Sequence, residues 1–317
     1  MPQSPLSDHY DGVRFFNPHA SPPRTFYDVF TWIRTRERPP WPAAVPLTAH
    51  DPPPSNVAPG QAAVTFIGHS TFLVRTASMT FVTDPVFTTH AGPLGWLGPR
   101  RVRPPAIAPA SLPPIDLVLV SHNHYDHLQP SSLALFADRA SFVAPLGLAD
   151  IVPKARELDW WQRVTIGGAE ITCVPAQHFS SRTPWDRNQT LWCGFVVRVD
   201  GMTIYFAGDS GYTSQFTEIG IRCPSIDVAL IPIGAYEPRW FMQPMHMNPE
   251  EAVRTHVDVK ARASIAMHFG TFHLTDEAID DPPRALEKAR TAAGVAPDAF
   301  RVLDFGETYL ASSAAPN

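Results

Sequence analysis

The segment SHNHYDHL, residues 121–128, places three histidines and an aspartate within six positions. Imidazole nitrogens and carboxylate oxygens are ligands for zinc and similar divalent ions, and in a His-x-His pair His122 and His124 project to the same side of an extended segment. Asp126 and His127 follow directly. These donors exceed the roughly three protein ligands that a catalytic ion uses while it keeps a position open for water. The cluster therefore predicts two metal ions.

A buried strand is expected to position this cluster. Residues 115–120, IDLVLV, form a continuous aliphatic run that is typical of a strand buried on both faces. Ligand sites in layered α/β folds gather at the carboxyl ends of strands, where a rigid scaffold is followed by loops. The alternative interpretation, a solvated polar loop with histidines present by chance, leaves so dense a cluster unexplained. We therefore expect a metal site at the end of this strand.

Three further donors end other strand-like segments. CVPAQH ends in His178, IYFAGD ends in Asp209 and IAMH ends in His268. Taken singly, the two histidines are typical of hydrogen-bonded core residues and the aspartate of a turn. A binuclear site, however, needs a further donor for each ion and a bridging ligand, which a carboxylate can be and an imidazole normally cannot. Together with the first cluster, these residues are expected to complete two metal shells.

The composition restricts the class of protein. The chain has 317 residues, 44% of them hydrophobic, so it can bury a large core and is not of the disordered class. Its formal net charge of -5 argues against a nucleic-acid binder, which needs a basic face to offset phosphates. The three cysteines form no Cys-x-x-Cys pair, and no apolar stretch approaches the roughly 20 residues that span a bilayer. We expect a cytoplasmic protein that is neither exported nor transmembrane.

One large domain with a preceding arm is expected. Proline-rich connectors are concentrated before residue 114, and residues 1–60 are predicted to form an N-terminal arm that packs on the core. Residues 61–312 are predicted to form the main domain, and residues 313–317 a tail.

Within the arm, one segment has the pattern of an amphipathic helix. Phe26, Phe30 and Ile33 recur at helical spacing, and Pro39 and Pro40 are expected to end the helix. Two interpretations remain open. The helix either packs on the protein's own core or contacts a membrane surface.

The main domain alternates between strand-like and helical patterns. The strand-like segments, in chain order, are AVTFIGHSTFLV, MTFVTDP, IDLVLV, SFVAP, AEITCVPAQH, WCGFVVRV, MTIYFAGD, VALIPIG and SIAMHF. The Asp-Gly pair at 200–201 predicts a hairpin. A capping box that begins at Asn248 predicts one helix, and Pro282 opens another that stops near Gly294. Two packed sheets covered by helices, an α/β fold, are therefore expected.

The motifs together resemble a known superfamily. His-x-His-x-Asp-His, followed by isolated His, Asp and His, is similar to the metallo-β-lactamase superfamily, which implies a four-layer αβ/βα sandwich. Longer strings resemble the N-acyl-phosphatidylethanolamine phospholipase D family: GHSTFLV, TDPVF, GPRR, PPIDLVLVSHNHYDHL, FAGDSGY, IPIGAYEPRWFM, HMNPEEAV and MHFGTF. The resemblance extends from about residue 15 to residue 309.

The resemblance implies a role for each candidate residue. One zinc ion is held by His122, His124 and His178, the other by Asp126, His127 and His268, and Asp209 bridges them. Manganese or iron in place of zinc remains open. Tyr125 and His246 are implied to contact the substrate, and Asp84 is expected to orient a metal-bound histidine or water by accepting an N–H.

The implied reaction is of the phospholipase D type. A metal-bound hydroxide would attack the phosphodiester of an N-acyl-phosphatidylethanolamine-type lipid, with Asp209, His246 and Asp84 as catalytic residues. The alternative is a metal-dependent lactonase or another carbonyl-directed hydrolase of the same superfamily. Met245 stands where the animal enzymes are expected to have a polar residue, so the headgroup pocket is expected to differ.

The expected partner is a phospholipid or another phosphodiester, with a peripheral membrane contact and no nucleic acid. The rim of the site is expected to combine the arm with Trp240, Phe241 and Met242. His69, in GHS, is interpreted as a buried histidine at a strand end and is left out of the ligands. The oligomeric state stays open.

Overall fold

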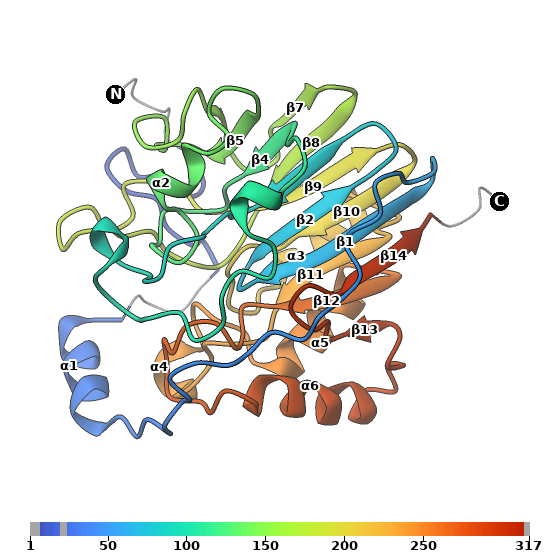
Figure 1. Ribbon diagram of the computed structural model, residues 1–317. Helices are drawn as coiled ribbons and strands as arrows, with labels where there is room; N and C mark the ends of the chain where they lie inside the picture. The colour runs from blue at the N-terminus through green and yellow to red at the C-terminus, as the bar shows by residue number, and fades with distance from the viewer. Residues whose placement is uncertain (1–6, 20–23, 314–317) are drawn as a thin grey trace.

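Two sheets of seven strands each form the centre of the molecule (Figure 1). The computed structural model describes residues 7–19 and 24–313. The order of strands is β14-β1-β2-β3-β4-β5-β6 in the first sheet and β13-β12-β11-β10-β9-β8-β7 in the second. In each sheet one half is antiparallel and the other half parallel.

The strands have the following bounds. The first sheet contains β1 (Gln61–Gly68), β2 (Thr71–Arg75), β3 (Thr80–Thr83), β4 (Leu117–Leu119), β5 (Ser141–Pro145), β6 (Arg156–Leu158) and β14 (Thr308–Ser312). The second contains β7 (Arg163–Ile166), β8 (Ala169–Val174), β9 (Gly194–Val199), β10 (Met202–Phe206), β11 (Val228–Pro232), β12 (Ala263–Met267) and β13 (Phe300–Arg301).

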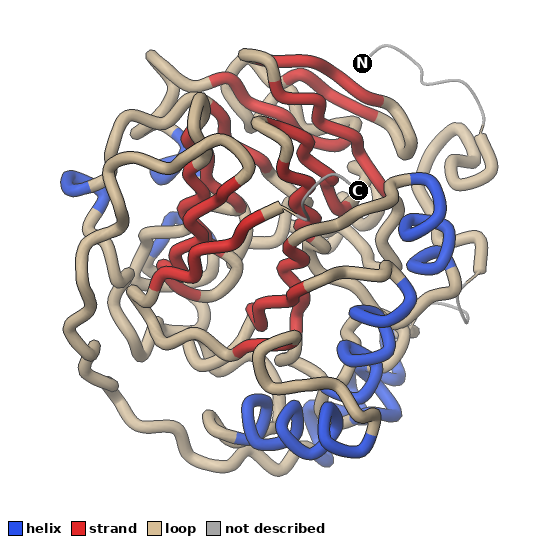
Figure 2. Tube along the Cα trace, turned by 90° about the vertical axis from the view of Figure 1, so that its right-hand side faces the viewer, coloured by secondary structure: helices blue, strands red, loops and turns tan. Residues whose placement is uncertain are grey.

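The helices lie outside the strand layers, as Figure 2 shows. They are α1 (Phe26–Thr35), α2 (Pro130–Leu133), α3 (Gln215–Arg222), α4 (Arg239–Met242), α5 (Pro249–Asp258) and α6 (Asp281–Ala292), with short 3₁₀ turns at η1 (Pro93–Gly95) and η2 (Pro109–Ser111). Among the residues that the structure describes, none of the helices is both long enough and apolar enough to cross a membrane.

The main core lies between the two sheets. Phe66 and Phe72 from the first sheet and Phe195 and Phe206 from the second are fully buried in one cluster. A second cluster on the outer face of the first sheet includes Leu133 of α2, and α5 packs on β11, α3 and α6 beside the second sheet. The layers therefore follow the order helix, sheet, sheet, helix. This is the αβ/βα sandwich predicted from the sequence.

Several local predictions are confirmed. Asn248 accepts a hydrogen bond from the Glu251 N–H, and the Glu251 carboxylate accepts from the Asn248 N–H, which is the predicted capping box. The hairpin between β9 and β10 turns at Asp200 and Gly201, whose φ angles of 53° and 79° lie in the left-handed region. Gly294, with φ 67°, follows α6.

The helix of the arm ends earlier than the sequence suggests. Its last residue is Thr35, before Pro39 and Pro40, and Arg36 already has extended backbone angles. The guanidinium of Arg36 pairs with the Asp276 carboxylate at 3.0 Å. The helix thus ends four residues before Pro39, and the extended Arg36 contacts a distant part of the chain.

The arm lies along the loop that follows β12. Trp32 stacks on Phe241 with ring centroids 4.9 Å apart, and its indole N–H donates to Asp276 at 2.8 Å. Further along, the Trp41 indole N–H donates to the Glu277 carbonyl at 3.0 Å. The arm therefore contacts both α4 and the segment that carries His268.

A buried histidine fastens the described N-terminal residues. His9 lies between Asp8, at 2.6 Å from Nδ1, and Asp159, at 2.7 Å from Nε2, and its ring stacks on Trp160. Burial lowers the pKa of His9, but the carboxylates of Asp159 and Asp8 outweigh it and raise the pKa above 6.5.

This arrangement predicts a pH-dependent contribution to stability. Because the pKa is raised in the folded state, the stabilisation is fully present below about pH 6.5 and is lost as the pH rises through the folded-state pKa. We expect His9→Gln to lower the free energy of unfolding by about 1–2 kcal/mol at about pH 5.5 and by clearly less at about pH 9.5. Denaturant unfolding of both proteins at the two pH values measures this. An equal loss at both would contradict a charged His9.

Candidate metal centre

The predicted donors follow strands of both sheets at their carboxyl ends. β4 leads into the loop with residues 122–127, β8 precedes His178, β10 precedes Asp209 and β12 precedes His268. Both sheets therefore deliver donors to the same edge of the sandwich, and their ligand atoms lie within 4.8 Å of one another in groups of three or four.

Three imidazoles form the first group. His122 Nε2 lies 2.9 Å and His178 Nε2 lies 3.1 Å from His124 Nδ1. The other ring nitrogens are engaged elsewhere, since His122 Nδ1 contacts the Ser121 hydroxyl at 2.9 Å and His178 Nδ1 contacts the Met245 carbonyl at 2.8 Å. Three ring nitrogens therefore face one point, with the orientation of two rings fixed from outside.

Two carboxylates and two imidazoles form the second group. Asp209 Oδ2 lies 3.1 Å from His127 Nε2 and 3.0 Å from His268 Nε2. Asp126 Oδ2 lies 3.6 Å and 3.4 Å from the same two nitrogens. Asp209 Oδ2 is also 3.9 Å from His178 Nε2 in the first group. Asp209 thus lies between the two groups, where a bridging carboxylate has to be.

Asp84 lies behind His127. Its carboxylate is fully buried, contacts His127 Nδ1 at 2.6 Å, and accepts from the Ser121 N–H at 2.7 Å. With Nδ1 held as a donor to Asp84, the lone pair of His127 Nε2 points at the second group. This is the carboxylate–histidine pairing that orients metal ligands.

The unsatisfied atoms of the site fit bound cations. Among the described residues, the buried atoms without a hydrogen-bond partner include His127 Nε2, Asp209 Oδ1, His246 Nδ1 and both ring nitrogens of His268. A buried polar atom without a partner costs about 1–3 kcal/mol, so this many in one place would strongly destabilise an apolar core. Two divalent cations would give most of these atoms a partner, and the donor set suits zinc.

The charges of the site also fit cations. Burial raises the pKa values of Asp209 and Asp126, but the imidazoles of His127 and His268 outweigh it and hold both pKa values well below the usual range. Burial lowers the pKa of His268, while Asp209 and Asp126 raise it to about 9. Burial, helped by His178, lowers the pKa of His124 to about 3 and leaves this ring neutral, as a ligand must be. A bound cation would supply the positive charge that the carboxylates otherwise attract as a proton on His268.

Of the two predicted substrate contacts, His246 lies beside the metal donors. His246 Nδ1 is 3.9 Å from Asp209 Oδ2, and its ring centroid is 5.0 Å from that of His178 and 5.4 Å from that of His268. Tyr125 lies in the loop of the first cluster, but its hydroxyl donates to the Arg182 carbonyl at 2.9 Å. The Tyr125 oxygen is therefore left with lone pairs to offer a substrate.

Sequence reasoning missed one histidine of the cluster. His69 Nε2 lies 3.0 Å from Asp126 Oδ2, and its ring centroid is 4.1 Å from that of His268. The available signal was the same as for the other donors, a histidine at the end of a buried strand-like segment. The sequence alone favours a buried histidine at a strand end, which gives no reason to count His69 with the cluster.

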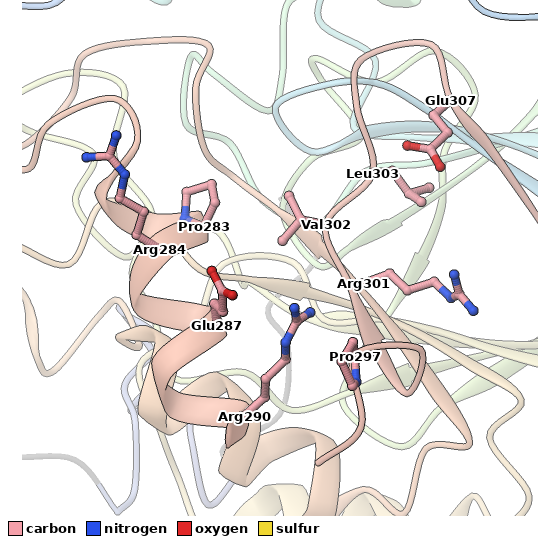
Figure 3. A pocket seen from close by; sticks show the side chains of 9 residues that line it. All are labelled: Pro283, Arg284, Glu287, Arg290, Pro297, Arg301, Val302, Leu303 and Glu307. Carbon is pink, nitrogen blue, oxygen red and sulfur yellow. The ribbon is translucent and has the colours of Figure 1, made fainter. Parts of the chain in front are cut away.

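A surface depression elsewhere carries several arginines (Figure 3). It is lined by Pro283, Arg284, Glu287, Arg290, Pro297, Arg301, Val302, Leu303 and Glu307. No predicted site residue lines it. Its arginines already have partners, because Arg290 donates to the Phe300 carbonyl, Arg301 to the Asp298 carbonyl, and Arg284 pairs with Asp280. The metal centre is the better candidate for chemistry.

The fold and the donor set define a class of protein. Residues 79–269 match the Beta-lactamase superfamily domain, and this range contains all the predicted metal ligands together with Asp84 and His246. The chain belongs to this superfamily, as predicted from the sequence. It is also 31% identical over 236 residues to a protein of Pelotomaculum thermopropionicum named as a metal-dependent hydrolase, a match that covers 72% of this chain and 93% of that protein.

Individual relatives refine this assignment. The chain is 38% identical over 268 residues to an N-acyl-phosphatidylethanolamine-hydrolyzing phospholipase D of Caenorhabditis elegans. The aligned region covers 78% of this chain and 75% of that protein. It is 40% identical over 236 residues to an uncharacterized protein of Mycobacterium tuberculosis, covering 71% of this chain and 63% of that relative. The match thus spans less than two thirds of the mycobacterial protein.

A solved structure supports the fold alone. A metallo hydrolase of the archaeon Ignicoccus hospitalis superposes with a TM-score of 0.60 at 24% identity, covering 79% of this chain and 98% of that one.

Proposed function

We propose that the chain is a binuclear zinc-dependent phosphodiesterase that hydrolyses N-acyl-phosphatidylethanolamine-type lipids in a phospholipase D type reaction. The observation that carries the proposal is the position of Asp209 Oδ2, at 3.0 Å from His268, 3.1 Å from His127 and 3.9 Å from His178. One carboxylate oxygen thus serves both groups of donors. The substrate class follows the nematode relative, which is named for it.

Each residue of the site has a separate role in the proposed reaction. Two zinc ions held there would lower the pKa of water and neutralise charge on the phosphate. Asp84 keeps His127 in the tautomer that a ligand needs, through the 2.6 Å contact to Nδ1. His246 donates a ring N–H to a non-bridging phosphate oxygen, where charge builds up as the bond to the leaving group breaks. Tyr125 lines the approach.

The substrate class is tested with a panel of purified compounds. We expect the full-length protein to release phosphatidic acid from N-acyl-phosphatidylethanolamine, and to hydrolyse lactones and β-lactams much more slowly. Chelation should abolish turnover, and adding back zinc, manganese or iron(II) separately identifies the metal. Fast lactone hydrolysis with no phosphodiester turnover would favour the carbonyl-directed alternative.

Exposed apolar side chains on several segments support a membrane contact near the site. They are Phe26, Tyr27, Phe30 and Ile33 on α1, Leu94 and Trp96 at η1, Trp185, and Trp240. Three of these segments adjoin the loops of the metal donors, and α1 packs on one of them, α4, through Trp32 and Phe241. The Gln129 amide donates to the Gly92 carbonyl, Arg182 donates to the Asn123 and Leu128 carbonyls, and α4 leads directly to His246.

The rim differs in part from the expectation. Phe241 and Met242 are buried, with 6% and 4% exposed, because Phe241 packs beneath Trp32. Trp240, 45% exposed, is the member of the predicted trio that faces solvent. We propose a cytoplasmic enzyme that binds the membrane surface peripherally through α1 and the neighbouring loops, with no role for nucleic acid. The three cysteines are free and buried, which suits a reducing compartment.

The arm can be tested separately from the metal centre. Phe30 and Ile33 are 60% and 59% exposed, so the double change to serine should alter the free energy of unfolding by no more than about 1 kcal/mol. We expect hydrolysis of long-chain lipid in vesicles to fall roughly 10-fold or more, because apolar area is lost from the membrane-facing helix, while a small soluble phosphodiester is hydrolysed normally.

The matched control removes two exposed apolar residues elsewhere. Ile221 on α3 and Val257 on α5 are 64% and 55% exposed, and changing both to serine should leave both activities intact. Equal losses for both substrates in the arm variant, with a lower melting temperature, would mean that α1 only packs the fold.

A further inference from the structure

His69 occupies a tight turn between two paired strands. β1 ends at Gly68 and β2 begins at Thr71, and His69 has a φ of 56°, in the left-handed region. Only 2% of His69 is exposed. It lies outside residues 79–269, the range that matches the superfamily domain, and none of the proposed functions above uses it.

The second group of donors is already complete without His69. Asp126 Oδ2 and Asp209 Oδ2 lie 3.0–3.6 Å from His127 Nε2 and His268 Nε2. A tetrahedral ion with bonds of about 2.0–2.1 Å places its ligands roughly 3.3 Å apart, and the four carboxylate–imidazole distances are of this size. His69 Nε2 lies at hydrogen-bond distance from one of these atoms, Asp126 Oδ2, at 3.0 Å, and a ring nitrogen of His69 lies within 4.8 Å of the ligand atoms of His127 and His268. Because four donors are present without His69, the short contact to Asp126 is the interaction that defines its place in the cluster.

Several ligands of the centre have a hydrogen-bond partner that fixes their orientation, and for Asp126 this partner is His69. His127 is held by Asp84 and His178 by the Met245 carbonyl. Within the described part of the chain, and apart from contacts inside the cluster, the Asp126 carboxylate has a hydrogen-bond partner in His69 alone. Asp126 is also the most exposed of the second ion's ligands, with 13% of its side chain exposed against 0–1% for the others.

We propose that His69 is a positioning residue for the second metal ion. Its Nε2–H donates to Asp126 Oδ2 and holds that carboxylate at the ion, so His69 sets the affinity of the second site and not that of the first. The proposal rests on the proposed binuclear centre. It adds a determinant of how firmly the second ion stays bound.

The main chain of His69 allows the side chain to be tested alone. The His69 carbonyl accepts from the His268 N–H at 2.9 Å, and the His69 N–H donates to the Thr271 hydroxyl at 3.0 Å. Any side chain at this position keeps these two bonds. Asparagine tolerates the left-handed backbone better than most residues and is too short to reach Asp126. His69→Asn therefore removes this hydrogen bond together with the ring packing on His268 and Phe272, and His69→Gln, which also lacks the ring, separates the two effects.

The experiment is a zinc titration of the metal-free full chain against a chromophoric chelator. We expect His69→Asn to lower the affinity of the second site for zinc by about 10–100-fold and to leave the affinity of the first site unchanged. His69→Gln, whose amide can reach Asp126, should recover most of the affinity. The control is Ser70→Ala, because Ser70 is buried next to His69 and its hydroxyl has no partner among the described residues, so neither affinity should change.

Two outcomes of the titration would overturn the proposal. If the affinity of the second site is unchanged in His69→Asn, the contact with Asp126 does not support metal binding. If both affinities fall equally, the role of His69 is merely structural. If wild type binds fewer than two ions, the binuclear centre itself fails, and this result is distinct from both.

A second measurement needs no variant. Long-range proton–nitrogen spectra of the zinc-loaded wild type should show a proton on His69 Nε2. An unprotonated, metal-bound Nε2 would make His69 a direct ligand and reject the positioning role, even if the variants fail to fold.

Discussion

Replacing Asp209 by alanine is expected to remove both metal ions and to abolish hydrolysis. The Asp209 carboxylate is buried, and its Oδ2 lies 3.0–3.9 Å from ring nitrogens of His127, His268 and His178. Without it the two groups of donors lose their shared ligand. Of the two carboxylates that neutralise the positive charge of two buried ions, only one remains. Elemental analysis and turnover of the purified variant measure both effects.

Two further variants make this result specific. Asp200, at the turn of the β9–β10 hairpin, accepts hydrogen bonds from Thr76 and Ser78 between β2 and β3. Asp200→Ala should therefore lower the free energy of unfolding but keep both ions. His268→Ala should keep the first ion preferentially, because His268 Nε2 faces Asp209 and Asp126 of the second group. Full metal occupancy and normal turnover in Asp209→Ala would contradict a bridging role.

Replacing His246 by alanine is expected to separate metal binding from catalysis. His246 Nδ1 is 3.9 Å from Asp209 Oδ2 and lies within 4.8 Å of the ligand atoms of His178 and Asp209, but the two proposed metal shells do not use it. Loss of one donor that stabilises charge in the transition state lowers turnover by on the order of 10²-fold, and metal content should stay at the wild-type level.

A histidine outside the site provides the control for His246. His256 on α5 is buried and contacts the Ser264 hydroxyl at 2.7 Å, so His256→Ala should lower the melting temperature without a comparable loss of turnover by the folded protein. Unchanged turnover in His246→Ala, or loss of zinc from it, would reject the substrate-binding role.

Much of the site could be predicted from the sequence because each donor follows a buried strand. Residues 115–120 contain β4, and His178, Asp209 and His268 follow β8, β10 and β12. Strand ends are visible locally, as a change from aliphatic to polar residues. In a layered α/β fold, donors at strand ends gather at one edge, so their convergence could be inferred without knowing the order of the strands.

The turn at His69 could not be predicted in the same way. AVTFIGHSTFLV has strand character on both sides of Gly68, and local pattern does not reveal that β1 and β2 fold back on each other. That pairing is decided by the partners on either side, β14 and β3, which come from distant parts of the chain. His69 therefore joins the cluster through tertiary structure.

The arm shows the same limit. Amphipathic spacing predicts α1, but Arg36, the first residue after the helix, bonds to Asp276, which lies 240 residues away and is not visible in the local pattern. Likewise, Phe241 and Met242 looked like rim residues in sequence, and Phe241 became buried because Trp32 of the arm covers it.

The most direct test of the binuclear centre is the number of metal ions per chain. Elemental analysis of the purified full-length protein, combined with phosphodiester turnover before and after chelation, should find two divalent ions per chain, with activity rising to its full value only as the second is restored. Full phosphodiester activity with one ion per chain, or with none, would contradict the account.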